Sequence, residues 1–212
     1  MITNDMRPEG DLNIALVAST TDEGKNFYAF NYSGQRIIQQ MGCRRLVGSD
    51  RRQSRILTLY DGFLAALRSL TVRDKQLLIE TAKAENRPVK IVVSAIDKYF
   101  IEGLDSWIAD PAAVPVQVAR KDNWLLDRID DFLNDLVFDT DLGVTVICNR
   151  VTSDYVFTRH AFIWGQRVLS NPHEDSESRH KLPTHYSTVD KRAFLRPPAV
   201  AETATITVEE VR

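Results

Sequence analysis

The sequence has few cysteines, and this shortage excludes one class of protein. Its 212 residues include two cysteines, Cys43 and Cys148. A small secreted scaffold held by disulfides would carry many more. We therefore expect both cysteines to be small buried thiols in a reducing compartment, and a disulfide between them is the less favoured alternative.

Long apolar runs and an excess of charge are also missing. No run approaches the roughly 20 apolar residues that a membrane-spanning helix needs, and residues 1–10 lack the apolar segment of a signal peptide. The sequence thus predicts a cytoplasmic protein with no membrane partner. The formal net charge is −2, whereas a domain that binds nucleic acid over its whole surface is usually basic.

The remaining composition is that of a globular protein, with 43% hydrophobic and 26% charged residues. We expect an N-terminal arm at 1–10, one domain at 11–170 and an extended or partly disordered C-terminal tail at 171–212, because the last segment is polar and rich in proline. The end of that tail, 203–208, could add a strand to a sheet edge.

Hydrophobic patterning inside the domain predicts strands and helices in a mixed order. Short apolar runs bounded by turn residues predict strands at 12–18, 27–32, 36–47, 89–95 and 144–148. Apolar residues at helical spacing predict helices at 56–70, 72–85, 99–108, 123–136 and 155–169. This order indicates an α/β fold in which an antiparallel meander is continued by parallel strands through helical crossovers.

One stretch, 91–108, carries a resemblance to a known family. It resembles, without a gap, the fourth strand and following helix of the ribonuclease H-like family, whose pattern is an apolar strand, Ser-Thr-Asp-Ser, Tyr, Gly and Trp-Ile. The equivalents are Ser94, Tyr99, Gly103, Trp107 and Ile108. Segments 65–67 and 124–133 are similar to the helices before and after it.

The resemblance covers about 12–169 and implies a ribonuclease H-like mixed five-stranded sheet with flanking helices. It also implies that Gly103 lets its helix approach neighbouring structure closely and that Trp107 covers the core.

The family's chemistry needs clustered carboxylates that hold two divalent ions about 3.5–4 Å apart. The resemblance puts these carboxylates at Ala18, Leu57–Leu59, Ile96 and Phe162, and none of these residues is acidic. It therefore implies no bound metal, no cofactor and no catalysis, and no functional residue of the family carries over to this chain.

Three acids are candidates to rebuild such a site. Asp97 lies one residue past an expected ligand, but it is also well placed to cap the helix that follows, which is the favoured interpretation. Asp61 lies opposite much of the apolar stripe of its helix and is expected in solvent. Asp22 lies in a turn, where acids are common.

Histidines and arginines supply weaker candidates. His160 falls near the last expected ligand position and is expected to be a packed or surface residue, and His173, His180 and His185 give a weak zinc signal. The densest basic run could contact phosphates or an acidic partner, although a solvated loop is favoured: it comprises Arg44, Arg45, Arg51, Arg52 and Arg55.

Three functional hypotheses follow. The first is a catalytically silent scaffold that binds other proteins as an adaptor. The alternatives are a metal-dependent nuclease or junction resolvase with displaced acids, and a non-cleaving nucleic-acid binder that uses the arginines. In size and in its lost acids the chain is also similar to a group of large-bacteriophage proteins, related to junction resolvases in fold, that help to import selected proteins into the phage's nucleus-like compartment. That similarity implies cargo or shell proteins as partners.

Overall fold

The computed structural model describes residues 10–20, 26–46, 55–115, 118, 123–169 and 185–188. The strands are β1 (Leu12–Thr20), β2 (Asn26–Ser33), β3 (Gln40–Arg45), β4 (Val89–Ala95), β5 (Val144–Arg150) and β6 (His185–Thr188). The helices are α1 (Arg55–Arg68), α2 (Val72–Glu85), α3 (Lys98–Ala109), α4 (Trp124–Thr140) and α5 (Val156–Leu169).

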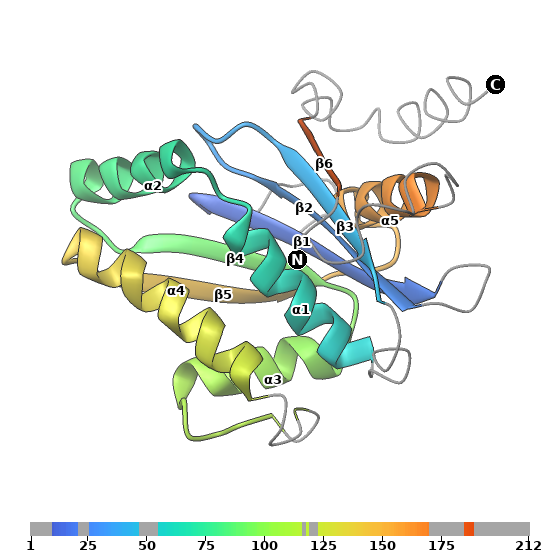
Figure 1. Cartoon of the computed structure of the whole chain (residues 1–212). Coiled ribbons are helices and arrows are strands. Elements are labelled where there is room, and N and C mark those ends of the chain that lie inside the picture. The colour runs from blue at the N-terminus through green and yellow to red at the C-terminus, as the bar shows by residue number, and fades with distance from the viewer. Residues whose placement is uncertain are drawn as a thin grey trace.

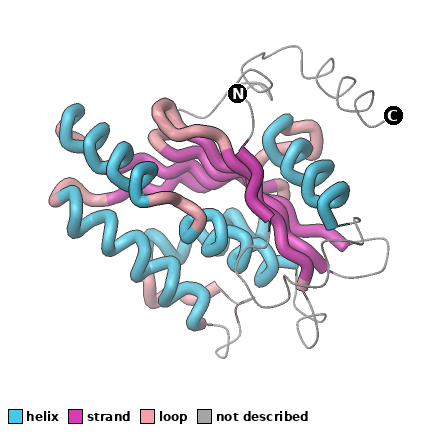
Figure 2. Tube along the Cα trace, turned by 45° about the horizontal axis from the view of Figure 1, so that its top comes forward, coloured by secondary structure: helices cyan, strands magenta, loops and turns pink. Residues whose placement is uncertain are grey.

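These strands form one mixed sheet in the order β5-β4-β1-β2-β3-β6. β1, β2 and β3 form an antiparallel meander, and β4 and β5 continue the sheet parallel to β1. Helices α1 to α4 cover one face of the twisted sheet and α5 lies on the other (Figures 1 and 2). The predicted α/β fold is therefore confirmed: an antiparallel meander is continued by parallel strands, as the resemblance implied.

The main core lies between the sheet and the four helices. Along β1, the side chains of Leu12, Ile14 and Leu16 alternate with those of the opposite face, as the two-residue period of a strand requires, and they join this core. Every residue of α1 from Leu57 to Leu67 is buried, because the helix lies between the sheet on one side and α3 and α4 on the other.

Two features implied by the resemblance are present in α3. Trp107 is buried in the main core. A Cβ atom at Gly103 would lie 3.1 Å from the hydroxyl of Tyr60 and 3.2 Å from Pro115. The glycine therefore lets α3 approach α1 closely, and the ring of Phe100 packs edge-on against Tyr60 at a centroid distance of 4.9 Å.

A buried ion pair at the start of β1 joins β1, β4 and the end of α2. Asp11, whose side chain is 3% exposed, lies next to Arg87, which follows α2. Arg87 donates from Nη1 and Nη2 to the two carboxylate oxygens at 2.6 and 2.7 Å, and the Lys90 N–H of β4 donates to Oδ2 at 2.8 Å. Asp11 thus holds the start of β1 against β4 and the end of α2.

The structure corrects one predicted strand boundary and adds a sixth strand to the five-stranded sheet that the resemblance implied. The third strand was predicted over 36–47, but β3 covers Gln40–Arg45, because a bend at 35–37 precedes it. Residue 47 lies outside the described residues. A sixth strand, β6, adds to the edge of β3 from within the predicted tail. The predicted strand at 203–208 lies outside the described residues.

Neither Cys43 nor Cys148 is in a disulfide; Cys43 is buried and Cys148 is partly buried. Cys43 packs under α5, whereas Cys148 packs against the core on the other face of the sheet. The expected burial is therefore confirmed for Cys43 and met only in part for Cys148. Among the described residues, no helix is both long and apolar enough to cross a membrane.

Candidate functional site

A pocket of about 230 Å³ lies where β1 and β4 end. In open α/β sheets, ligands bind in the crevice outside the carboxyl ends of the strands. Here the ends of these two parallel strands meet the first turns of α1 and α5. The described residues that line the pocket are Leu16, Val17, Ala18, Ser19, Arg55, Leu59, Ile96, Asp97, Ser153, Thr158, Arg159 and Phe162.

All four segments where the resemblance put a carboxylate contribute to this pocket. Ala18 comes from β1, Leu59 from α1, Ile96 from the end of β4 and Phe162 from α5. The fold therefore brings these distant parts of the sequence together, and it brings together apolar side chains. Among the described lining residues, Asp97 is the one carboxylate.

Asp97 caps α3. Its Oδ1 accepts a hydrogen bond from the Phe100 N–H at 3.1 Å, and its backbone has the extended conformation of an N-cap. The predicted capping role is confirmed. Its Oδ2 lies 3.9 Å from Nε of Arg55, a separation at the outer limit of an ion pair.

Of the two other acids considered for a rebuilt site, Asp61 lies among the described residues and does not join Asp97 in the pocket. Asp61 was expected in solvent, and this expectation is wrong: it is 9% exposed, because the whole middle of α1 is enclosed by the sheet and neighbouring helices. Asp61 does not line the pocket. Asp22 lies outside the described residues.

Two guanidinium groups line the pocket together with this single carboxylate. Arg55 begins α1 and is 59% exposed at its side chain, and Arg159 lies in the first turn of α5. Among the described residues, Arg159 has no acidic partner. The helix macrodipole adds positive potential at the amino ends of α1, α3 and α5, all of which reach the pocket. The site is therefore electropositive, the reverse of a carboxylate cluster that holds dications.

A second hollow of about 200 Å³ adjoins the pocket. The two share Ala18, Ser19 and Arg55, and the second is otherwise lined by Thr20, Asn26 and Thr58. Arg55 therefore borders both the pocket, which has several apolar side chains in its lining, and the polar hollow beside it.

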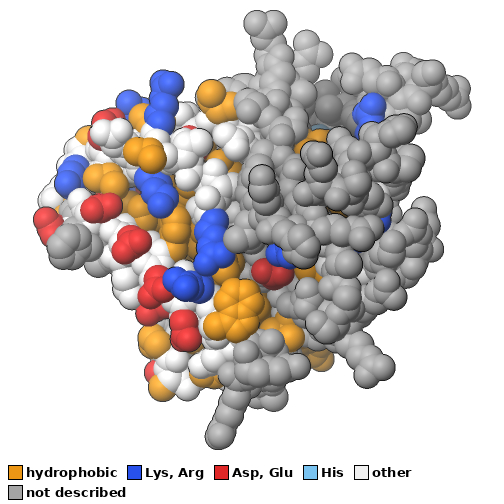
Figure 3. All heavy atoms as spheres, in the orientation of Figure 1, with side chains coloured by type: hydrophobic (Ala, Val, Ile, Leu, Met, Phe, Trp, Pro, Cys, Tyr) orange, Lys and Arg blue, Asp and Glu red, His pale blue; other side chains and the backbone are white. Residues whose placement is uncertain are grey.

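The predicted basic run does not form a single surface. Arg44 and Arg45 are neighbours on β3, so their side chains leave opposite faces of the sheet. Arg45 donates from Nη2 to the carbonyl of Leu169 at the end of α5. Arg55 reaches the pocket, and Arg51 and Arg52 lie outside the described residues. On the face that α1 to α4 cover, acidic and basic side chains are interspersed (Figure 3).

The histidines supply no metal cluster among the described residues, where no three His, Cys, Asp or Glu side chains are grouped to hold an ion. His160 is half-buried on α5, as expected for a packed residue. Burial, assisted by the charge of Arg159, lowers the pKa of His160 below its usual value. His173 and His180 lie outside the described residues, and His185 belongs to β6.

Sequence reasoning missed Arg159. It lies three residues before Phe162, hence on the same face of a helix, and Phe162 was already assigned to the site. Helical spacing from that assignment was the signal that could have found it.

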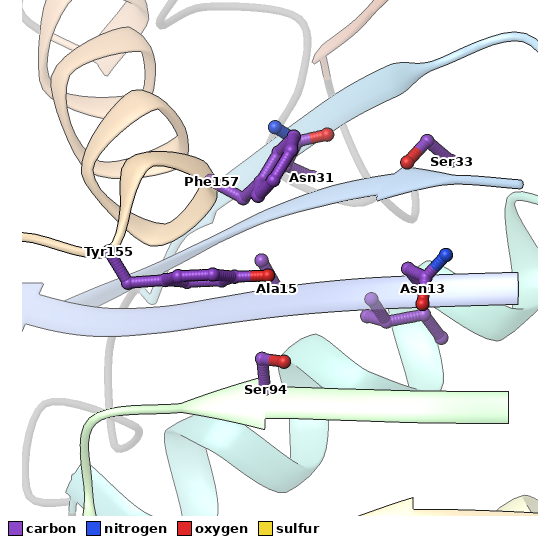
Figure 4. Close-up of a pocket in the computed structure, with 8 residues that line it drawn as sticks. Asn13, Ala15, Asn31, Ser33, Ser94, Tyr155 and Phe157 are labelled. Carbon is purple, nitrogen blue, oxygen red and sulfur yellow. The ribbon is translucent and has the colours of Figure 1, made fainter. Parts of the chain in front are cut away.

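A separate polar hollow lies on the α5 face, with room for about one water molecule at about 10 Å³. Asn13 and Ala15 of β1, Asn31 and Ser33 of β2 and Ser94 of β4 line it, with Tyr155 and Phe157 above them (Figure 4). Oδ1 of Asn31 accepts from Gln39 at 2.7 Å, whereas Nδ2 of Asn31 and Oδ1 of Asn13 have no partner within the described ranges. Because the hollow has room for about one water molecule, it is a small feature of the core and no site for a larger ligand.

No model of a known protein family matches the chain, and no curated protein matches it. It is similar to the solved structure of LC9-RNase H1, a type 1 RNase H with the type 2 active-site motif, at 11% identity and a TM-score of 0.49, over 93% of this chain and 86% of that one. It is also similar to the foamy viral protease-reverse transcriptase in complex with dsDNA, at 10% identity and a TM-score of 0.36, over 76% of this chain and 99% of that one.

Proposed function

We propose that this protein is a non-catalytic ribonuclease H-like domain that acts as a protein-binding adaptor. The observation that carries the proposal is the composition of the pocket where β1 and β4 end. The four positions where the resemblance puts carboxylates are occupied by apolar residues. These are Ala18, Leu59, Ile96 and Phe162, and two guanidinium groups line the same pocket.

Charge explains why this pocket does not suit metal-dependent cleavage. Two-metal catalysis depends on several carboxylates that neutralise and position the ions. Asp97 alone supplies one carboxylate, already engaged by the Phe100 N–H, and Arg55 and Arg159 would repel a dication. A nuclease with displaced acids would need Asp61 or Asp22 to lie close to Asp97, but the buried Asp61 does not line the pocket.

A protein partner is favoured over nucleic acid. The net charge is −2, and basic side chains do not dominate the described face in Figure 3. Nucleic-acid binding draws its affinity largely from many phosphate contacts with Lys and Arg.

The more specific form of the proposal is that the adaptor selects proteins for import into a phage nucleus-like compartment, in the cytoplasm of a bacterial host. It rests on the resemblance in size and lost acids, and its partners would be cargo or shell proteins. Comparing the location of fluorescent proteins in infected cells with and without this chain tests it: unchanged import of every protein would contradict this form.

A cleavage assay tests the absence of catalysis. The chain is incubated with RNA–DNA hybrid and four-way junction substrates in Mg²⁺ or Mn²⁺, alongside Asp97→Asn and the exposed control Asp110→Asn. We expect no cleavage by any of the three. Metal-dependent cleavage that is lost in Asp97→Asn but kept in Asp110→Asn would overturn the proposal and assign Asp97 to a rebuilt site.

A further inference from the structure

We infer that the pocket where β1 and β4 end binds an acidic side chain of a protein partner, flanked by an apolar residue. This inference deepens the proposed adaptor function, on which it rests. It names the chemistry of the partner at that site.

The charge of the pocket selects an anion. Among its described lining residues, the guanidinium groups of Arg55 and Arg159 outnumber the single carboxylate of Asp97. The pairing of Arg55 with Asp97 is loose, at 3.9 Å with Arg55 59% exposed, so Arg55 can turn toward an incoming ligand. Arg159 has no acidic partner among the described residues. Guanidinium groups bind carboxylates in a planar, two-pronged geometry.

Hydroxyl groups around the arginines add hydrogen-bond donors. Ser19 at the end of β1 is half-buried, and Ser153 is exposed just before α5. Either can donate to an oxygen of the same anion. Thr158 contributes less, since its hydroxyl already donates to the Tyr155 carbonyl at 2.9 Å.

The size and walls of the pocket favour a peptide over a nucleotide. At about 230 Å³ it is smaller than the roughly 300–1,000 Å³ of pockets that enclose drug-sized ligands, so it suits one or two side chains. Leu16 and Leu59 form a buried apolar floor beside the partly exposed Ile96 and Phe162. An apolar neighbour of the acidic residue would cover these side chains.

The adjoining hollow gives the peptide a direction. It shares Arg55 with the pocket, and its walls carry Thr20, Asn26 and Thr58. A chain that places its carboxylate between the two arginines would have the polar side chains of Thr20 and Asn26 on one side and apolar contacts with Phe162 on the other.

Selection from a random peptide library on the immobilised full chain, with EDTA present, tests the inference. We expect the selected peptides to be enriched in Asp or Glu beside an apolar residue. The double variant Arg55→Gln/Arg159→Gln should bind them at least about tenfold more weakly, the scale of a lost charge-assisted hydrogen bond. Replacing the peptide's acid by its amide should have a similar effect on the wild type.

Controls separate loss of binding from loss of folding. Arg55 and Arg159 are exposed, so the double variant should keep the thermal unfolding midpoint of the wild type. Arg128→Gln is the matched control, since Arg128 lies on α4, is 60% exposed and does not line the pocket. It should bind the selected peptides as the wild type does.

Three results would overturn the inference. These are no selectable peptide, selected peptides without acidic enrichment, and equal binding to the double variant. Arginine-dependent binding of a single-stranded oligonucleotide in place of any peptide would assign the pocket to phosphate and also overturn it. The cleavage assay is independent: a chain that cuts nucleic acid yet selects acidic peptides would refute the proposed function and leave this inference standing.

Discussion

The ion pair between Asp11 and Arg87 allows an asymmetric prediction about stability. Breaking a buried pair costs about 3–5 kcal/mol when the remaining charge stays buried. Arg87→Met leaves the carboxylate of Asp11, which is 3% exposed, without its charge partner, so we expect a loss in this range. That is a large part of the roughly 5–15 kcal/mol that stabilises a typical domain.

Substituting Asp11, the other partner of the ion pair, should lower the free energy of unfolding by less. In Asp11→Asn, the amide oxygen can still accept the Lys90 N–H, and the guanidinium of Arg87, which is 35% exposed, remains accessible to water. We expect a loss of roughly 1.5–3 kcal/mol, the scale of hydrogen bonds to a charged group. Arg87 also pairs with Glu85, and Glu85→Gln, at an exposed site, should cost less than about 1 kcal/mol.

The effect of pH provides an independent check. Burial by itself raises the pKa of Asp11, but the hydrogen bonds from Arg87 and the Lys90 N–H, with the charge of Arg87, outweigh it and lower the pKa below its usual value. Because the folded pKa lies below the unfolded value of about 3.9, this stabilisation is present above that value and is lost as the pH falls through the folded pKa. In Arg87→Met, the interactions of Arg87 no longer oppose the effect of burial, so the pKa of Asp11 is higher than in the wild type. Protonation of Asp11 then relieves the variant at a pH at which the wild type is only beginning to lose stability. The difference in the free energy of unfolding between the two proteins should therefore narrow as the pH falls.

Urea unfolding at pH 7 and near pH 4, followed by circular dichroism, measures these differences. The reasoning fails if Asp11→Asn destabilises the protein at pH 7 as much as Arg87→Met does. It also fails if the gap between the wild type and Arg87→Met widens in acid.

Two further predictions concern local packing. Thr71 caps α2 in a capping box with Asp74; Thr71→Ala should lower the free energy of unfolding by about 1 kcal/mol, while Thr81→Ala, in the helix interior, should cost less in the same urea titration. A Cβ atom at Gly165 would lie 2.8 Å from that of Ala29, so Gly165→Ala should lower the free energy of unfolding by roughly 1–3 kcal/mol through overpacking. Adding Ala29→Gly to the same chain should recover part of this loss. If the effects of the two substitutions are simply additive, the clash is contradicted.

The sequence predicted most of the elements because their signals are local. The run Val89–Ala95 is apolar and β-branched, and β4 has these bounds. The stripe that begins at Ile56 matches α1 closely. β3 was predicted too long, because Ile37, which is buried in the bend before it, resembles a strand residue in isolation.

The candidate site was predicted only in part. The resemblance named Ala18, Leu59, Ile96 and Phe162, and the fold brings these residues to one pocket. It did not indicate the burial of Asp61, which depends on how α1 is seated on the sheet. Arg159 could have been found, because it lies three residues before Phe162 on the same helix. Helical spacing shows which residues share a face, but the neighbour of that face is set by strand order, which no local pattern specifies.

Asn31, Ser94 and Asn149 form a row of polar side chains across the α5 face of the sheet. This polar row affects how the strands align. Asn31 of β2 lies opposite Ala15 of β1, Ser94 of β4 is opposite Ala15 on the other side, and Asn149 of β5 donates to Ser94 at 3.3 Å. A strand that slipped by one residue would turn its amide or hydroxyl into the apolar core on the other face. An unpartnered buried amide costs about 1–3 kcal/mol, so each polar residue of the row penalises misaligned pairing of its own strand.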